Sequence, residues 1–314
     1  MNKTLGWLKN HRIAVLKGGW SRERPISLLT GAAVEKAFAV MGVKTLNIDV
    51  RRDIASRLAK IRPDFCFIAL HGTFGEDGQV QSLLERMKIR YTGSGPLGSS
   101  LAMDKNISKR LFIDHNVPTA PWILLEKHQS VDPVYAWLKK SALFVKPVDQ
   151  GSAIGATRVD RPAQLPRALK ASFRVSGRAM IEKFIPGREV TVGILGNKPL
   201  PVVEIIPKHA FYDFHSKYAA GGSRHVAPAK LPAALSKKIQ RVAVEAFKAL
   251  RCRIYGRVDL LIAKNNDLFV LEVNTIPGMT ATSLLPDAAR VAGLSFNDLV
   301  LRICALSLAD RGKQ

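Results

Sequence analysis

Cysteine is scarce in this chain of 314 residues, which contains only Cys66, Cys252 and Cys304. Their number is odd and they lie far apart, so the sequence offers neither a disulfide framework nor a metal-binding spacing. Cys66 and Cys304 lie inside apolar runs, where a buried thiol is expected. We therefore expect a reducing, cytoplasmic setting.

Long hydrophobic runs are also absent. No apolar stretch approaches the roughly 20 residues that a helix needs to span a bilayer. The N-terminal segment MNKTLGWLKNHRIAVLKGG is basic, but it lacks the continuous apolar core and the small-residue cleavage site of a signal peptide. We expect no membrane partner.

Acidic residues are few, with 25 Asp and Glu against 48 Lys and Arg, and the net charge is +23. Such an excess can indicate a nucleic-acid-binding protein, which would bind DNA or RNA tightly with a steep salt dependence. The basic residues are spread along the chain, however, and no basic run exceeds two residues. We therefore expect a generally basic surface and no nucleic-acid partner, although this charge would favour a polyanionic ligand such as ATP.

The first third of the chain alternates strands and a helix. Short apolar runs at 13–19, 43–50 and 64–72 predict strands, and helical spacing predicts a helix at 26–41 with Ile26, Leu29, Ala33, Ala37 and Val40 on one stripe. This alternation predicts a parallel α/β sheet. Ligands bind such sheets beyond the carboxyl ends of the strands, where GGWSRE and HGTFGEDG both fall.

The remainder predicts mixed α and β structure. The segment YTGSGPLGSS contains a formal G-x-G-x-x-G, but Pro96 argues against a turn into a helix, so we predict a loop that leaves the first domain. A single amphipathic helix is predicted at 103–114, with Met103, Ile107 and Leu111 on one stripe. The middle third predicts an antiparallel sheet with helices on one side. The last third predicts a helix at 236–250, a hairpin at 256–273 and a helix at 296–308.

The hairpin carries polar residues on one face. Glu272 and Asn274 are two positions apart in an apolar strand, so they project to the same side. A two-residue turn at Asn265-Asn266 would place Asp259 opposite Glu272 and Arg257 opposite Asn274. One strand pair would then carry two carboxylates, an amide and a guanidinium on one side.

Two facing carboxylates are unfavourable unless a cation lies between them. Carboxylate and amide oxygens suit Mg²⁺, which usually takes phosphate oxygens for its remaining ligands. Lys146 and the glycine-rich loop 151–155 could contact those phosphates, although the P-loop pattern is absent. We therefore predict one or two Mg²⁺ ions that carry a nucleotide. The alternative is a surface network neutralised by Arg257, which the apolar strands do not favour.

Several segments together resemble the ATP-grasp ligases, and closely the D-alanine–D-alanine ligases of bacterial cell-wall synthesis. The resemblance covers nearly the whole chain. The segments are GGWSRERPIS (18–27), ALHGTFGEDGQVQSLLE (69–85), YTGSG (91–95), MDK (103–105), VKP with QGSAIG (145–155), IEKFIPGREVTV (181–192), FYDFHSKY (211–218), GRVDLL (256–261) and LEVNTIPGMTATSLLP (271–286).

This resemblance implies a fold class of α/β and α+β. An N-terminal parallel α/β domain (1–95) would precede an ATP-grasp fold of two α+β subdomains (96–186 and 187–314). It implies that ATP activates one D-alanine as an acyl phosphate and that the amine of a second displaces phosphate, giving D-alanyl-D-alanine for peptidoglycan precursors with release of ADP and phosphate. It also implies a homodimer.

The resemblance further implies roles for individual residues. The expected ATP-binding residues are Lys105, Lys146, Glu182, Lys183, Phe184, Ile185, Glu189 and Lys217. Asp259, Glu272 and Asn274 would bind Mg²⁺, with two ions expected and Mn²⁺ as a substitute. His71 would lie by the carboxylate of the first D-alanine, and Ser283 and Leu284 would bind that of the second. The expected catalytic residues are Glu23, Ser152, Tyr218, Arg257 and Gly278.

Among these, Glu23 would hold the first ammonium and, with Ser152 and Tyr218, form a hydrogen-bonded set that closes the site. Arg257 and the Gly278 N–H would stabilise the tetrahedral oxyanion. The resemblance also implies that the second substrate is an amino acid and not a hydroxy acid, because the chain retains Tyr218. The glycine-rich, basic segment 218–229 predicts a loop that orders on binding.

Two positions depart from the family pattern. Pro25 stands in the first loop, where it removes a backbone donor, and Phe184 stands where Trp is common. Simpler interpretations also exist, since His71 could cap backbone groups and Glu23 could form a surface ion pair of little energetic value. Two further hypotheses are another ATP-grasp carboxylate–amine ligase and an inactive relative that serves as an interaction module.

Overall fold

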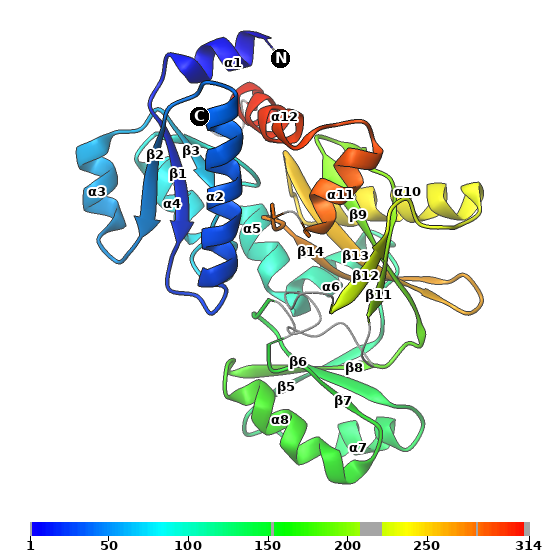
Figure 1. The fold of residues 1–314 in the computed structure, drawn as a ribbon. Helices are drawn as coiled ribbons and strands as arrows, with labels where there is room; N and C mark the ends of the chain where they lie inside the picture. Colours follow the sequence, from blue (N-terminus) through cyan, green and yellow to red (C-terminus); the bar gives the residue numbers. More distant parts are fainter. Residues whose placement is uncertain (1, 152–153, 208–221, 281, 311–314) are drawn as a thin grey trace.

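The protein contains three β-sheets, each in a different part of the chain (Figure 1). The computed structural model describes residues 2–151, 154–207, 222–280 and 282–310. The first sheet lies at the upper left of Figure 1, the second at the bottom and the third at the right. This confirms the predicted combination of α/β and α+β structure.

The N-terminal sheet is fully parallel, as predicted, with the strand order β2-β1-β3-β4. Its strands are β1 (Ile13–Gly18), β2 (Thr45–Val50), β3 (Phe65–Ile68) and β4 (Arg90–Tyr91). The accompanying helices are α1 (Asn2–Lys9), α2 (Arg24–Val40), α3 (Ile54–Ile61) and α4 (Gln79–Arg86). The loops after β1 and β3 lie at the carboxyl edge of this sheet.

The buried face of helix α2 contains Ser27, Thr30, Gly31, Val34, Ala37 and Phe38, so its predicted apolar stripe is partly wrong. Leu29 and Val40 are 58% and 67% exposed. The buried Ser27 hydroxyl accepts the Gly18 N–H at 2.8 Å and donates to the Ala69 carbonyl at 2.7 Å, which ties α2 to the ends of two strands. Hydropathy cannot reveal a helix face chosen by such hydrogen bonds.

The segment 96–114 forms two helices, α5 (Pro96–Met103) and α6 (Lys105–Asp114). The predicted loop at Pro96 is therefore wrong, whereas the helix predicted at 103–114 is confirmed as α6, except that Met103 belongs to the end of α5. Pro96 begins α5, where its missing N–H costs nothing. Asp104 caps α6 by accepting the N–H groups of Asn106 and Ile107 at 2.9 and 3.0 Å. Ile107 is 40% exposed, and the buried face of α6 instead contains Lys105 and Lys109.

The second sheet is antiparallel, with the strand order β5-β8-β6-β7, as predicted for the middle third. Its elements are β5 (Trp122–Glu126), α7 (Asp132–Leu138), β6 (Leu143–Pro147), β7 (Thr157–Val159), η1 (Pro162–Gln164), α8 (Leu165–Phe173) and β8 (Arg178–Lys183). Figure 1 shows α7 and α8 on the same side of this sheet.

The third sheet has the strand order β12-β11-β9-β13-β14, with β10 paired to β9, and is antiparallel. Its strands are β9 (Gly187–Leu195), β10 (Lys198–Pro199), β11 (Val203–Pro207), β12 (Ser223–Val226), β13 (Tyr255–Ala263) and β14 (Leu268–Asn274). Its helices are α10 (Ala233–Ala249), α11 (Leu284–Val291) and α12 (Phe296–Ala309), and they confirm the helices predicted near 236–250 and 296–308.

Some helices pack against a sheet that lies in a different predicted domain. The domain boundaries themselves stay a prediction. Each predicted range holds one sheet. Residues of α5 and α6, however, pack in the core of the third sheet, and α12 shares a hydrophobic cluster with α2 and β3 of the first. Among the helices that the structure describes, none alone is long and apolar enough to cross a membrane, and only the bent pair α11 and α12, at 100°, passes on length and composition.

Candidate active site

The β13–β14 hairpin places its polar residues as predicted. Arg257 lies opposite Asn274 and Asp259 lies opposite Glu272. The three acidic and amide side chains therefore lie on one face of two neighbouring strands. Asp259 is only 3% exposed, so this is not a solvated surface face.

The predicted turn of this hairpin is wrong, although the predicted pairs near the site are right. Leu260 pairs with Val270, which shifts the register by one residue next to Asp259. The Ala263 N–H donates to the Asp267 carbonyl at 2.9 Å, and Asn266 has φ of +63°, so the turn holds three residues and not two. A bulge at Leu271 absorbs the extra residue and restores the predicted pairing.

Cations on the same face accompany both carboxylates. Arg257 donates two hydrogen bonds to Asp259, at 2.8 and 2.7 Å, and the Thr191 hydroxyl donates a third at 2.6 Å. Lys105 Nζ lies 3.3 Å from a Glu272 oxygen. Arg257 therefore does neutralise Asp259, as in the alternative of a surface network. The pair is buried, however, and does not lie on a solvated surface.

These residues fit a magnesium site completed by phosphate. Within the described parts of the chain, no group of three or more His, Cys, Asp and Glu side chains is placed to hold a metal. The Asp259–Glu272–Asn274 set instead offers two carboxylates and one amide, and the Asn274 oxygen accepts the Ile276 N–H at 3.0 Å while keeping a second lone pair. Mg²⁺ needs few protein oxygens when a nucleotide supplies the others.

A pocket between the second and third sheets gathers the residues expected to bind ATP; we call it the nucleotide pocket. Its lining includes seven of the eight expected residues, Lys105, Lys146, Glu182, Lys183, Phe184, Ile185 and Glu189, together with Asp259 and Glu272. Lys217, the eighth, lies outside the described residues. The structure therefore brings together side chains from β6, β8, β9, β13 and β14.

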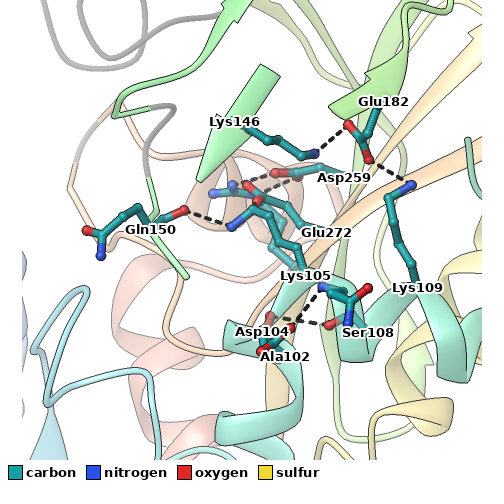
Figure 2. A network of polar contacts seen from close by, with 12 residues as sticks. Ala102, Asp104, Lys105, Ser108, Lys109, Lys146, Gln150, Glu182, Asp259 and Glu272 are labelled. Carbon is teal, nitrogen blue, oxygen red and sulfur yellow. Dashed lines mark hydrogen bonds and ion pairs between the residues drawn. The ribbon is translucent and has the colours of Figure 1, made fainter. Parts of the chain in front are cut away.

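A buried row of charges lies beside this pocket (Figure 2). The Glu182 carboxylate lies 2.7 Å from both Lys109 Nζ and Lys146 Nζ. Burial opposes the charge of Glu182, but the two lysines outweigh it and hold the pKa of that carboxyl below its usual range. Lys109 is not among the residues predicted from the sequence, in which its only signal is its position one helical turn after Lys105.

A second pocket, which we call the amino-acid pocket, gathers the expected substrate residues. Its lining includes Glu23, His71, Arg257, Gly278, Ser283 and Leu284, with Glu272 and Asn274. Ser152 and Tyr218 lie outside the described residues, as do the first four residues of the predicted loop 218–229. The pocket joins the carboxyl edge of the first sheet to the third sheet.

Glu23 is held at the edge of the first sheet. Its N–H donates to the Ser21 hydroxyl at 3.1 Å. A Cβ added at Gly72 or Gly151 would lie 2.7 or 3.0 Å from Glu23 Oε2, so both glycines leave room for this carboxylate. Pro25 lies in the first turn of α2, where the departure from the family pattern does not disturb the helix.

His71 and Glu76 lie in the loop after β3. His71 Nε2 lies 3.0 Å from the Thr30 hydroxyl, and burial lowers the pKa of this imidazole, so it is neutral at pH 7. Glu76, which the sequence analysis quotes within a motif but does not select, lines the amino-acid pocket and accepts the Gly72 N–H at 2.6 Å. Burial, and secondarily the charge of Glu23, raises the pKa of Glu76 to about 8.

Ser283 lies at the start of α11, beside Gly278. A Cβ added at Gly278 would lie 2.9 Å from Ser283 Oγ. That hydroxyl accepts the Thr280 N–H at 3.0 Å and lies in the lining of the amino-acid pocket. The first N–H groups of a helix and its dipole favour a carboxylate at this end.

The two pockets meet at Lys105 and Glu272, which line both. Lys105 Nζ also donates to the Gln150 carbonyl at 2.7 Å, which connects it to the glycine-rich loop. A phosphate held in the first pocket and a carboxylate held in the second would therefore approach each other at these two side chains. Such an arrangement suits phosphoryl transfer between the two ligands.

Known proteins have similar sequences and folds. The family model for the D-ala D-ala ligase C-terminus matches residues 111–305, and that for the N-terminus matches residues 51–94. The chain is 46% identical over 300 residues to the D-alanine–D-alanine ligase of Citrifermentans bemidjiense, covering 96% of this chain and 97% of the relative. It is 45% identical to that of Trichlorobacter lovleyi, covering 98% of each.

Solved structures agree. The D-alanine–D-alanine ligase of Bacillus anthracis superposes with a TM-score of 0.86 at 34% identity, covering 95% of this chain and 97% of the other. The same enzyme complexed with ATP gives a TM-score of 0.83 over the same shares of the two chains, also at 34% identity. The chain belongs to the D-alanine–D-alanine ligase family.

Proposed function

We propose that this protein joins two D-alanine molecules to D-alanyl-D-alanine at the expense of ATP, for peptidoglycan precursor synthesis. The observation that carries the proposal is the meeting of the nucleotide pocket and the amino-acid pocket at Lys105 and Glu272. The carboxylate of one D-alanine would attack the γ-phosphate of ATP there, giving an acyl phosphate and ADP. The amine of the second D-alanine would then displace phosphate.

In the nucleotide pocket, Lys105, Lys146 and Lys217 would hold the phosphates. Glu182, Lys183, Phe184 and Ile185 would surround the adenine, and Glu189 would bind the ribose hydroxyls. The ATP complex of the Bacillus anthracis relative supports this use of the pocket. The hydrogen-bonded strands β9, β11 and β13 form one side of the pocket.

Asp259, Glu272 and Asn274 would hold Mg²⁺, with two ions expected and Mn²⁺ as a substitute. The metal supplies positive charge to the phosphate oxygens as their charge develops. Arg257 already donates two hydrogen bonds to Asp259, and Lys105 already forms an ion pair with Glu272. The experiment for this part is ATP binding with Mg²⁺, with Mn²⁺ and with a chelator.

In the amino-acid pocket, Glu23 would bind the ammonium of the first D-alanine, and the neutral His71 would lie by its carboxylate. Ser283, Leu284 and the start of α11 would bind the carboxylate of the second. Arg257 and the Gly278 N–H would stabilise the tetrahedral oxyanion, because their donors are fixed before the reaction. Ser152 and Tyr218 would close the loop over Glu23.

The test is phosphate release with ATP, Mg²⁺ and D-alanine, together with mass-spectrometric identification of the product. L-alanine, D-lactate and a reaction without an amino acid are the controls. We expect the dipeptide from D-alanine alone. Turnover with another acceptor would instead support a different carboxylate–amine ligase, and ATP binding without any turnover would support an inactive relative.

We also infer a homodimer in a reducing, ATP-containing cytoplasm. The three cysteines are free and buried, which suits that compartment. Val40 is 67% exposed on α2, away from both pockets, and a second copy would cover it. Light scattering of the purified protein tests the dimer, for which we expect twice the chain mass.

A further inference from the structure

Lys109 is a buried cation without a role in the proposed reaction. It lies on α6 and its side chain has no exposed surface. It does not line either pocket, in contrast to Lys105 one turn earlier on the same helix. A buried ammonium is unfavourable unless oxygen atoms surround it, so its surroundings indicate what it stabilises.

Three oxygens surround the Lys109 ammonium. The Thr119 hydroxyl lies at 2.7 Å, the Ala120 carbonyl at 2.8 Å and Glu182 Oε1 at 2.7 Å. The Trp122 ring lies 5.2 Å from the same nitrogen. Two of its donors therefore form hydrogen bonds, and its contact with Glu182 is a close ion pair, in which Oε1 has no hydrogen-bond partner.

Two of these partners, Thr119 and Ala120, lie in the segment between α6 and β5, which is hydrogen-bonded to both the third and the second sheet. The Thr119 hydroxyl donates to the Val270 carbonyl on β14 at 2.8 Å, and the Val270 N–H donates to the Pro118 carbonyl at 2.8 Å. On the other side, the Lys183 N–H of β8 donates to the Pro121 carbonyl at 3.1 Å. Lys109 thus joins α6 to the connection between the two sheets that enclose the nucleotide pocket.

The third partner, Glu182, forms ion pairs with two lysines that differ in their access to the pocket. Lys146 lines the nucleotide pocket and is partly exposed, whereas Lys109 is enclosed and cannot reach a ligand. A phosphate in the pocket would attract Lys146 away from Glu182. Of the two cations that the described residues place beside this carboxylate, Lys109 would then remain, and it would keep Glu182 charged and in place.

We propose that Lys109 is a positioning residue for nucleotide recognition, which holds Glu182 as a charged acceptor for the adenine amino group while Lys146 binds phosphate. This rests on the proposed function only in so far as the pocket binds ATP. Figure 2 shows the geometry, with Glu182 between the two lysines and Lys109 on the side of α6. The acceptor role predicts a preference for ATP over inosine triphosphate, which has an oxygen in place of the amino group.

The experiment is calorimetric titration of ATP and of inosine triphosphate, with Mg²⁺ and without D-alanine. The variants are Lys109→Met, Glu182→Gln and the double variant, and Arg110→Met, at an exposed position of the same helix, is the control. We expect Lys109→Met to weaken ATP binding by roughly tenfold or more and to reduce the preference for ATP. In the Glu182→Gln background the same change should alter the affinity by less than about twofold.

The proposal would be overturned if Lys109→Met weakened ATP binding equally in the wild-type and Glu182→Gln proteins and left the preference for ATP over inosine triphosphate unchanged. Lys109 would then serve only the fold. If Lys109→Met does not fold, ATP binding by the double variant is compared with ATP binding by Glu182→Gln. The double variant removes the charges of both Lys109 and Glu182, so it leaves no unpaired buried charge between them. Failure of the double variant to fold as well would also overturn it. A wild-type protein that binds ATP without forming dipeptide would contradict the proposed function but not this inference.

Discussion

Glu76 is a buried carboxyl group whose ionisation should affect stability. Its pKa is raised to about 8 in the folded protein, so the unfolded chain loses this proton first as pH rises. Wild-type stability relative to Glu76→Gln should therefore fall between about pH 5 and pH 8, by up to about 1.4 kcal/mol per pH unit. Urea unfolding of both proteins across this range measures the difference.

The matched control for that titration is Asp77→Asn, since Asp77 lies next to Glu76 and is more exposed. It removes a charge from the same loop and leaves the buried carboxyl group of Glu76 in place. A stability difference for Glu76→Gln that does not change between pH 5 and pH 8 would contradict the raised pKa.

Arg24 holds the loop that carries Glu23. It donates to both carboxylate oxygens of Asp49 at 2.7 and 2.8 Å and to the Gly19 carbonyl at 3.1 Å. Asp49→Ala should leave this loop less constrained and raise KM for D-alanine by about threefold to tenfold, with the affinity for ATP unchanged. Steady-state kinetics with each substrate varied measures both values.

Asp53→Ala is the control for this prediction, because Asp53 is exposed near the end of the same strand. Its KM values should match those of the wild type. A change in ATP affinity with Asp49→Ala would show that Asp49 acts on the whole site and not on the Glu23 loop.

At the scale of the element, the β13–β14 hairpin shows how far a sequence pattern reaches. The alternation of polar and apolar residues predicts which side chains share a face, and this is confirmed for Asp259 and Glu272. The turn length is not encoded in that alternation. Asn265 and Asn266 fit a two-residue turn as well as a three-residue one, and only the bulge at Leu271 distinguishes them.

Asn266 should tolerate glycine but not a β-branched residue, because its φ is +63°. Asn266→Gly should leave the free energy of unfolding nearly unchanged, whereas Asn266→Val should lower it by about 1–3 kcal/mol. Thermal and urea unfolding measure both effects. Equal stability of the two variants would contradict the three-residue turn.

Helix α6 shows why part of the candidate site could not be predicted. Periodicity assigns the core face of a helix to its apolar residues, which are Met103, Ile107 and Leu111 in this segment. The buried face of α6 instead holds Lys105 and Lys109, and the oxygen partners of Lys109 come from positions 119, 120 and 182. A buried charge of this kind has no local sequence signature, because its partners are set by the tertiary fold.

At the scale of the whole molecule, α12 connects the C-terminal part of the chain to the first sheet. Ile303 and Leu299 are fully buried in a cluster that also contains Phe38 and Phe67. Ile303→Ala should lower the free energy of unfolding by about 2–5 kcal/mol. Because the cluster is shared, the first and third sheets should continue to unfold in one transition.

Circular dichroism and tryptophan fluorescence together measure this, since Trp7 packs against the same cluster. Arg302→Ala, at the exposed neighbouring position, is the control and should change stability little. Two separate transitions in Ile303→Ala would show that the shared cluster does not couple the sheets.

The fold class could be predicted at this scale, but the packing between units could not. Alternating strands and a helix predict the parallel sheet, and turn-separated short strands predict the antiparallel ones, because each pattern reflects local burial. The amphipathic pattern of α12 predicts that one side of the helix is buried. It does not predict which sheet that side packs against. The sharing of one core by residues 8–67 and 284–304 therefore had to come from the structure.

Lys105 and Glu272 form a wall common to the nucleotide and amino-acid pockets, so a ligand on either side changes the charge that the other side presents. We then expect the binding of ATP and the binding of D-alanine to be coupled, with a coupling free energy different from zero. By thermodynamic linkage, the factor by which ATP changes the affinity for D-alanine equals the factor by which D-alanine changes the affinity for ATP. The protein with one substrate bound is thus a different receptor for the other.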